Sequence, residues 1–304
     1  PYNVDGWRLD VAADLGHSEE YNHQFWRDFR RNVKEANPNA IILAEHYGDA
    51  KPWLTGDQWD TVMNYDAFME PITWFLTGME KHSDEYREGM LGNSDSFIGA
   101  MNYHGASFYA PSLYTAMNEL SNHDHSRFLT RTNHVVGRVR ELGSEAAERN
   151  VNKAVLREAV VMQMTWPGAP TAADNRRTYP WGREDKELIQ FHKDMIKIHK
   201  ENPSLIKGSL KFIANDYQQL VYGRFTEKEK IMVVINNGNE TKNMEISVWE
   251  LGISRTKTQK FKQLMVTGDF GYSLVKKIHE CKGGVLHLEV PSHGAIIVRG
   301  ILEE

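Results

Sequence analysis

The sequence predicts an α/β unit built on a parallel sheet, followed by an all-β sandwich. Before residue 202, short apolar runs alternate with amphipathic helical segments, a pattern typical of parallel sheets. Beyond Asn202-Pro203 come about 100 residues of short β-like runs, separated by turns rich in Gly, Asn and Asp. We therefore place a domain boundary near residue 202, which gives domains 1–202 and 203–304.

The elements of the first domain follow from spacing and capping. Residues 19–35 carry Tyr, Phe and Val at intervals of four, which is one face of a helix, and Ser18 is a suitable N-cap. The run 40–45 (AIILAE) is typical of a buried parallel strand, and 61–65 (TVMNY) is a further strand candidate. Helices are predicted over 68–81, 83–91, 112–118, 145–165 and 186–201.

The second domain is predicted from its turns. Asn237-Gly238, Gly268-Asp269 and Gly283-Gly284 separate short runs with β-like composition. Strands are expected over 210–213, 220–225, 231–236, 243–248, 263–267, 285–290 and 295–299.

Composition excludes several classes of protein. The chain has 304 residues, a net charge of −5 and 40% hydrophobic residues, so a buried core is available and a basic nucleic-acid surface is not expected. No apolar run approaches the ~20 residues of a membrane helix. A lone Cys281 and His spacings that match no zinc motif indicate no metal site and no cofactor. The compartment is not fixed by the sequence; we favour the cytoplasm over secretion.

Three carboxylates stand after short apolar segments: Asp10, Glu45 and Asp124. If the strands are parallel neighbours, these side chains point into one mouth. Arg8 precedes Asp10 by two residues, so the two share a strand face, and the guanidinium would hold that carboxylate ionised as a nucleophile requires. A second carboxyl in a drier place would serve as a general acid. Two such groups are the machinery of a retaining glycosidase, although an isolated Asp after a strand is more often a helix cap or a salt-bridge partner.

Three ordered motifs carry a family resemblance. DGWRLDVA (5–12), AEHYGDA (44–50) and LSNHDHSRF (120–128) resemble the strand-4, strand-5 and strand-7 motifs of the α-amylase family of glycoside hydrolases. WLTGDQWDTVMNYD (53–66) and DNRRTYPWG (174–182) resemble its cyclomaltodextrinase, neopullulanase and amylopullulanase branch. The resemblance implies that residues 1–202 are strands 4 to 8 of a (β/α)₈ TIM barrel.

The resemblance also implies roles. Asp10 would form the covalent glycosyl-enzyme, and Glu45 would protonate the leaving oxygen and then deprotonate water. Asp124 and His123 would bind the sugar that reacts, and Asp124 would bind it most strongly at the transition state. Arg8 would position Asp10, and Arg176 would contact substrate deeper in the cleft.

The chain departs from the family pattern in two places. The family's strands 1 to 3 have no counterpart, and MTWPGAPT (164–171) runs almost directly into AADNRR, where the family has the rest of strand 8 and a loop. We therefore expect these 304 residues to have little or no hydrolase activity by themselves. The resemblance leaves a structural Ca²⁺ ion open, and it allows a homodimer formed through an N-terminal part.

The predicted function is retaining hydrolysis of α-1,4-glucosidic bonds in maltooligosaccharides, cyclodextrins, starch or pullulan. Two alternatives stay open. A glucan transglycosylase would use the same intermediate with a sugar as acceptor in place of water. A non-catalytic glucan-binding half-barrel would keep the fold without the chemistry, although it would need neither a nucleophile nor an acid at these positions.

Overall fold

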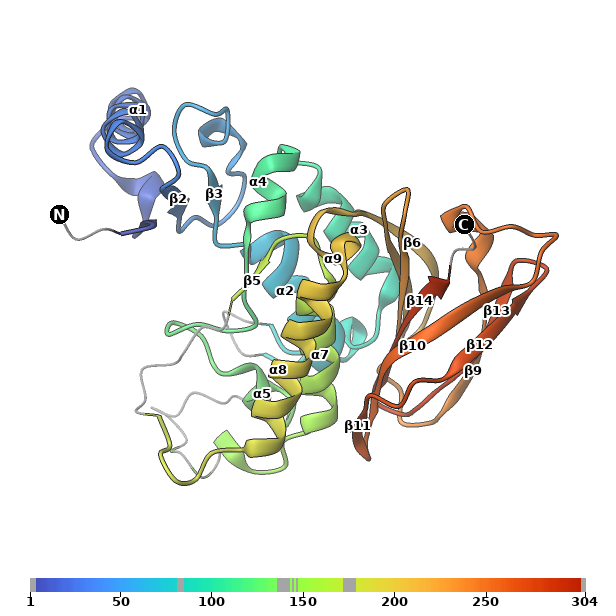
Figure 1. Cartoon of the computed structure of the whole chain (residues 1–304). Coiled ribbons are helices and arrows are strands. Elements are labelled where there is room, and N and C mark those ends of the chain that lie inside the picture. The colour runs from blue at the N-terminus through green and yellow to red at the C-terminus, as the bar shows by residue number, and fades with distance from the viewer. Residues whose placement is uncertain are drawn as a thin grey trace. The chain divides into compact units, whose positions relative to one another are not determined.

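The computed structural model describes residues 4–80, 85–135, 143, 145, 147–171 and 179–301 (Figure 1). The chain forms two compact units that are each discontinuous in sequence. The first unit comprises Pro1–Pro71, Gly99–Glu119 and Gly168–Thr171, and the second comprises Ile72–Ile98, Leu120–Pro167 and Ala172–Glu304. Helices α2 (Glu70–Thr77) and α3 (Ser94–Gly105) each begin in one unit and end in the other. The domain boundary near residue 202 stays a prediction.

The first unit is built on parallel strands, as the sequence predicts. They are β1 (Gly6–Leu9), β2 (Ile41–Ala44), β3 (Thr61–Val62), β4 (Met117–Asn118) and β5 (Ala169–Pro170). The pairs β1–β2, β2–β3 and β4–β5 are all parallel, and a parallel bridge between Met63 and Met117 links β3 to β4. The strands therefore lie side by side in sequence order, which brings their carboxyl ends to one edge.

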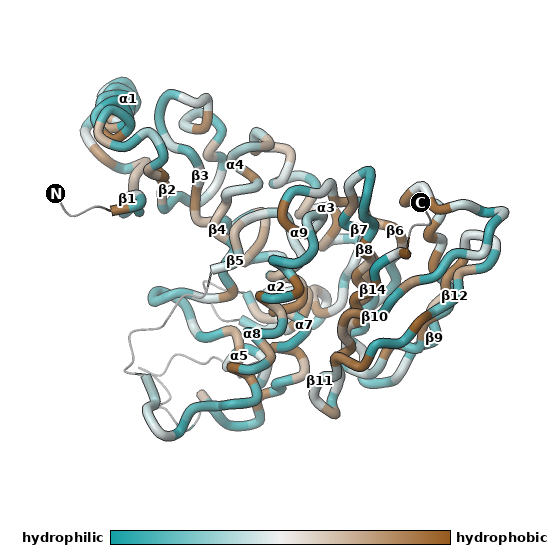
Figure 2. The backbone as a smooth tube through the Cα atoms, viewed as in Figure 1, coloured by the Kyte–Doolittle hydropathy of each residue, from teal (hydrophilic) through white to brown (hydrophobic). Residues whose placement is uncertain are grey.

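Helix α1 (Glu19–Ala36) covers this sheet and confirms the predicted helix and its cap. The backbone N–H of Tyr21 donates to the Ser18 hydroxyl at 3.2 Å. Trp26 on its inner face joins a buried cluster with Ile42 and Ala44 of β2. In Figure 2 the backbone of α1 is coloured mostly as hydrophilic, consistent with a helix that buries only one face. Shorter helical turns complete the unit: η1 (Ala12–Asp14), η2 (Lys51–Trp53), η3 (Tyr65–Met69) and α4 (Ala110–Thr115).

The strand predicted over 61–65 is shorter than expected. It ends at Val62, and a π-helical turn, η3, starts at Tyr65 with Met69 N–H donating to the Asn64 carbonyl. Asn64 is buried, and its amide donates to the Asn118 side chain at 2.8 Å. This contact between residues far apart in the sequence draws the chain out of the strand.

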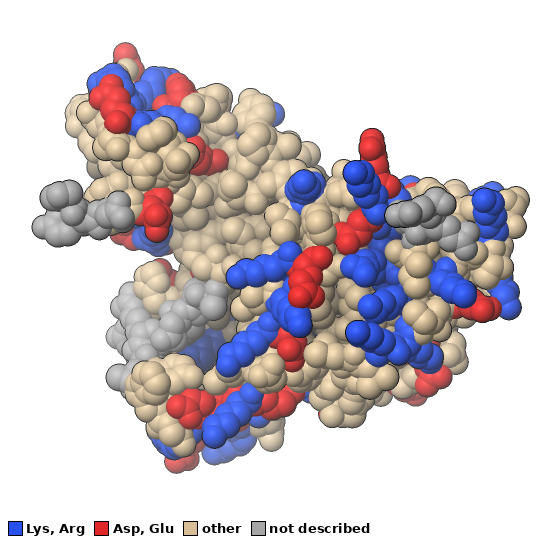
Figure 3. Space-filling view, viewed as in Figure 1, with Lys and Arg blue, Asp and Glu red and all other residues tan. Residues whose placement is uncertain are grey.

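The second unit carries the remaining helices: η4 (Glu88–Met90), α5 (Phe128–Arg131), α7 (Lys153–Thr165), α8 (Lys186–Glu201), α9 (Pro203–Lys207) and η5 (Val248–Leu251). Helix α8 has the predicted bounds, and Asp185 caps it. Its Lys and Glu residues lie on the exposed face (Figure 3). Helix α7 starts later than residue 145 because Asn152 caps it by accepting from Ala154 N–H at 2.8 Å. No helix in the described part of the chain is both long and apolar enough to cross a membrane.

The C-terminal strands form an antiparallel sheet of β6 (Ser209–Asp216), β7 (Gln219–Phe225), β8 (Lys230–Asn236), β9 (Lys242–Ser247), β10 (Gln259–Gly268), β11 (Gly271–Ser273), β12 (Ile278–Lys282), β13 (Val285–Val290) and β14 (Gly294–Ile301). The all-β character is confirmed, and buried side chains of β7, β8 and β14 share one core with those of β9 and β13, as expected for the predicted sandwich. One continuous sheet runs in the order β6-β7-β8-β14-β10-β12-β13-β9. The long strand β10 joins its halves, since it pairs with β14 on one edge and with β12 and β11 on the other.

Candidate active site

The register of β1 and β2 places two predicted catalytic residues beside each other. Leu9 pairs with Ala44, so the next residues, Asp10 and Glu45, leave adjacent parallel strands at the same level. Backbone bonds hold this edge, because Glu45 N–H donates to the Leu9 carbonyl at 2.8 Å. The side chains differ in exposure: that of Asp10 is 77% exposed and that of Glu45 only 8%.

Arg8 connects the two carboxylates. Its Nη1 donates to Asp10 Oδ1, and its Nη2 lies 3.0 Å from Glu45 Oε1. The contact between Arg8 and Asp10 that the strand spacing predicts is therefore confirmed. Partial burial lowers the pKa of the Arg8 guanidinium, but the hydrogen bond to Asp10 and the charges of Glu45 and Asp10 outweigh it and raise that pKa. The guanidinium is thus a fixed cation between two acids.

The backbone after Asp10 helps to orient Glu45. Val11 N–H donates to Glu45 Oε2 at 3.0 Å. Val11 adopts φ 42°, a left-handed conformation that a β-branched residue rarely takes. Strain of this kind persists where the surrounding structure imposes it and is concentrated at functional sites. Here the strained residue presents its amide to the buried carboxylate.

Tyr65 is a neighbour of Glu45 that is not among the site residues predicted from the sequence. It is buried, its hydroxyl lies 3.5 Å from Glu45 Oε1, and its ring stacks on Tyr47 at 4.2 Å. Burial raises the pKa of Tyr65, and the hydrogen bond with Tyr47 raises it further. The phenol therefore stays a neutral donor beside Glu45. The π-helical turn that starts at Tyr65 also indicates that Tyr65 is a site residue, because such turns are frequent at functional sites.

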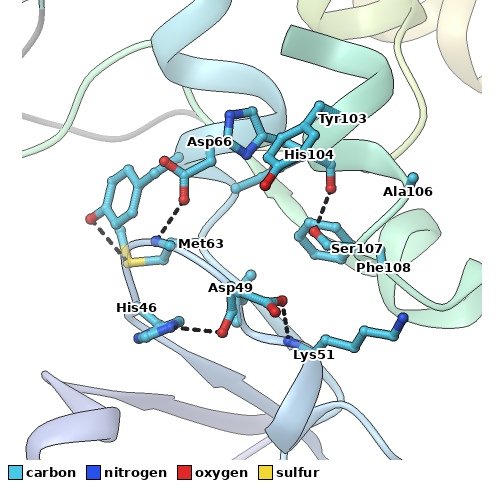
Figure 4. A pocket seen from close by; sticks show the side chains of 14 residues that line it. His46, Asp49, Lys51, Met63, Asp66, Tyr103, His104, Ala106, Ser107 and Phe108 are labelled. Carbon is cyan, nitrogen blue, oxygen red and sulfur yellow. Dashed lines mark hydrogen bonds between the residues drawn. The ribbon is translucent and has the colours of Figure 1, made fainter.

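A pocket of about 530 Å³ opens beside Tyr65 in the same unit. Figure 4 shows Asp66, Tyr103 and His104 on one side of it and His46 and Asp49 on the other. Asp66 is fixed by accepting from Gly48 N–H at 2.7 Å. Aromatic rings, carboxylates and imidazoles in one cavity suit a ligand that carries many hydroxyl groups. The full lining is His46, Gly48, Asp49, Lys51, Val62, Met63, Asn64, Tyr65, Asp66, Tyr103, His104, Ala106, Ser107 and Phe108.

Asp124 and His123 lie in a turn of the second unit, six residues beyond β4. His123 Nε2 is 3.3 Å from Asp124 Oδ2, and Asp124 N–H donates to Asn122 Oδ1 at 2.9 Å. The two residues are therefore close to each other and half-exposed. Their convergence with Asp10 and Glu45 stays a prediction.

Two further predictions concern Arg176 and metals. Arg176 falls in residues 172–178, which lie outside the described residues. Within the ranges that the structure describes, no three His, Cys, Asp or Glu side chains form a group that would hold a metal ion.

This chain is similar in sequence to a known protein family and to several characterised enzymes. Residues 1–172 match the family described as "Alpha amylase, catalytic domain". Neopullulanase 2 of Thermoactinomyces vulgaris is 32% identical over 271 residues, which is 82% of this chain and 40% of that protein. A cyclomaltodextrinase of Thermoanaerobacter pseudethanolicus is 29% identical over 289 residues, covering 89% of this chain and 43% of its own length. The chain thus spans about two fifths of these relatives.

Solved structures agree on the fold. The debranching enzyme of Nostoc punctiforme superposes with a TM-score of 0.75 at 23% identity, over 98% of this chain and 58% of that one. A cyclomaltodextrinase structure gives a TM-score of 0.73 at 24% identity, over 98% and 46% of the two chains. The resemblance predicted from the three motifs is confirmed: the chain belongs to the α-amylase family of glycoside hydrolases, through its catalytic domain.

Proposed function

We propose that this protein is a retaining α-glucan hydrolase in which Asp10 is the nucleophile and Glu45 is the acid and base. The observation that carries the proposal is the single guanidinium of Arg8, which touches both carboxylates at the ends of adjacent parallel strands. The exposed Asp10 is accessible to an anomeric carbon, whereas Glu45 lies in the drier position that suits a proton donor. Maltooligosaccharides, cyclodextrins, starch and pullulan are the proposed substrates.

Asp10 and Glu45 together would carry out both steps of the proposed reaction. An Asp10 oxygen bonds to the anomeric carbon while the bond from that carbon to the leaving sugar oxygen breaks, and Glu45 gives its proton to that oxygen. Glu45, now a carboxylate, then takes a proton from water as the water oxygen attacks the anomeric carbon and releases Asp10. The pocket beside Tyr65 lies next to Glu45 and would receive the leaving sugar.

The strand order supports a partial barrel. Parallel strands β1 to β5 follow one another in sequence order, as the last five strands of a (β/α)₈ barrel do. In such a barrel Asp124 and His123 would bind the reacting sugar, and Arg176 would contact substrate. We also propose that the reaction needs no cofactor, that the protein forms a homodimer and that it is located in the cytoplasm.

The test needs a complete barrel, because a half-barrel leaves an unpaired strand edge beside Asp10. We define the extended chain as these 304 residues joined to the first three barrel strands of a cyclomaltodextrinase. We expect it to hydrolyse maltooligosaccharides, and the unextended chain to show little or no turnover. Asp10→Asn in the extended chain should lower kcat by about 10³-fold or more while glucan binding survives.

Each of these two expectations has a result that would contradict it. Near-normal turnover of Asp10→Asn would mean that Asp10 is not the nucleophile. Family-like turnover by the unextended chain would mean that the described half-barrel suffices. Product analysis at high substrate concentration then separates hydrolysis from transfer to a sugar acceptor.

A further inference from the structure

The second unit contains a cleft that the proposed chemistry does not use. Its volume is about 790 Å³, within the range of ligand sites. The first turns of α7 and α8 form one side, and the turn between β10 and β11 forms the other. Its lining is Asn150, Val151, Asn152, Lys153, Ala154, Arg157, Glu187, Asp269, Phe270, Gly271 and Tyr272.

Two aromatic side chains give this cleft an apolar surface. Phe270 is 63% exposed, so its ring is accessible to a ligand. Tyr272 is held in place, since its ring packs on Phe191 at 4.9 Å and its hydroxyl donates to Asp194 at 2.8 Å. Burial raises the pKa of Tyr272 to about 12, so it stays neutral. One fixed ring beside one exposed ring is a surface on which a flat, weakly polar face can stack.

Arg157 supplies hydrogen-bond donors that its protein partners use incompletely. The residue is 5% exposed although it lines the cleft. Its Nη1 lies 3.3 and 3.4 Å from the oxygens of Glu187, which is long for a charge-assisted bond, and its Nη2 donates to the Gly268 carbonyl at 3.1 Å. Its Nε has no hydrogen-bond partner among the described residues. A ligand that accepts from Nη1 would improve on these bonds.

The charges argue against an anionic ligand. Lys153 and Arg157 are offset by Glu187 and Asp269 around the same cleft. The helix ends are also already satisfied, because Asn152 accepts from Ala154 N–H at 2.8 Å and Asp185 accepts from Leu188 N–H at 3.0 Å. Donors, acceptors and rings with balanced charge suit a neutral ligand rich in hydroxyl groups.

We infer that this cleft is a second α-glucan binding site, with Phe270 and Tyr272 stacking on sugar rings and Arg157 and Glu187 bonding hydroxyl groups. The choice of an α-glucan as the ligand rests on the proposed function. None of these residues takes part in the chemistry assigned to Asp10 and Glu45. The site would hold a long glucan without cleaving it.

The experiment measures retardation of the 304-residue chain in native gels containing glycogen, with dextran gels as the control polymer. Phe270→Ala should raise the apparent dissociation constant for glycogen about tenfold, since it removes one stacked ring. Phe270→Trp should keep the wild-type affinity. Tyr217→Ala is the matched control, because Tyr217 is 59% exposed in the same unit but lies outside the cleft, and it should change nothing.

Three results would overturn the inference: a wild-type chain that glycogen does not retard, a change below threefold in Phe270→Ala, or retardation that inorganic phosphate abolishes and maltoheptaose does not. The outcome is separable from that of the catalytic proposal. Asp10→Asn should be retarded like the wild type, so loss of binding in Phe270→Ala stands even if Asp10 proves not to be the nucleophile.

Discussion

Arg8 donates to Asp10 with one terminal nitrogen of its guanidinium, and the other terminal nitrogen forms an ion pair with Glu45. A lysine ammonium is a point charge on a flexible stem and cannot hold two carboxylates in this planar fork. The mutual placement of Asp10 and Glu45 therefore depends on the guanidinium, and not on positive charge by itself.

Arg8→Lys in the extended chain should lower kcat about 10²-fold, because a displacement of about 1 Å in a reacting group has an effect of that size. Its free energy of unfolding should change by less than about 1 kcal/mol, since the ammonium keeps a positive charge beside the carboxylates and the Asp10 side chain is 77% exposed. Arg27→Lys is the control, because Arg27 pairs with Asp57 at 2.8 Å on the surface of the same unit. Equal activity of the two variants would show that the fork is not needed.

Glu158 on α7 is a fully buried carboxyl group, in contrast to the exposed Asp10. Neither of its carboxyl oxygens has a hydrogen-bond partner in the part of the chain that the structure describes. Burial, and then the charge of Asp269, raise its pKa well above the usual 4.5. The folded state therefore keeps a proton that the unfolded state loses, so stability is full below pH 4.5 and is lost as the pH rises toward the folded-state pKa.

Glu158→Met should raise the free energy of unfolding at pH 7.5 by about 1–3 kcal/mol, since it removes a buried, unsatisfied carboxyl. The gain should shrink as the pH falls toward 4.5, where Glu158 begins to be protonated in the unfolded state as well as in the folded state. Urea unfolding at the two pH values measures it, with the exposed Glu201→Met on α8 as the control. A gain that does not depend on pH would contradict the raised pKa.

The contact between Arg8 and Asp10 was predictable because alternate strand residues share a face. The role of Tyr65 was not, since aromatic residues in a sequence look alike whether they pack in a core or face a catalytic acid. Trp59 and Tyr65 are both buried, so burial alone does not separate a core residue from one that contacts Glu45. The contact of Tyr65 with Glu45 depends on the parallel pairing of β2 with β3, which no local pattern encodes.

At the scale of elements, the pair β4–β5 depends on a close approach at Gly168. This glycine has φ 130°, and a Cβ atom there would lie 2.4 Å from the Asn118 side chain. Asn118 in turn accepts from the buried Asn64 amide. The glycine thus lets the last parallel strand reach the side chain that ties β4 to the turn after β3.

Gly168→Ala should lower the free energy of unfolding by about 1–3 kcal/mol through backbone strain and the clash with Asn118. Gly99→Ala is the matched control, because Gly99 lies inside α3 with nothing near its missing Cβ, and it should be neutral or stabilising by up to about 1 kcal/mol. Urea unfolding compares the two. A Gly168→Ala variant as stable as Gly99→Ala would contradict this expectation, because it would show that the chain adjusts to avoid the clash with Asn118.

Strong periodic patterns predicted elements well, and weak ones did not. Helix α8 has the predicted bounds because its apolar spacing and its Asp185 cap agree. Helix α3 was not predicted, since Ser94–Gly105 contains two glycines and little amphipathic pattern; buried Phe97 and Met101 hold it in the folded chain. The short strands β11 and β12 were also not predicted, because their pairing with β10 defines them more than their composition does.

At the scale of the whole molecule, the predicted site residues are divided between the two compact units. Arg8, Asp10 and Glu45 belong to the first unit, whereas His123 and Asp124 belong to the second. The ordered motifs predicted the family, which the match over residues 1–172 confirms. Membership of the family does not by itself identify the nucleophile. The proposed role of Asp10 requires that its carboxylate form a bond to the anomeric carbon of the sugar.

The most direct measurement is identification of the covalent intermediate. The extended chain carrying Glu45→Gln is incubated with an activated 5-fluoro-α-glucosyl fluoride, which needs little acid assistance, and is then digested and analysed by mass spectrometry. We predict a glucosyl label on Asp10, and no label when Asp10→Asn is added. A label on Asp124 or elsewhere, or turnover of the reagent that leaves Asp10 unmodified, would contradict the assignment of the nucleophile.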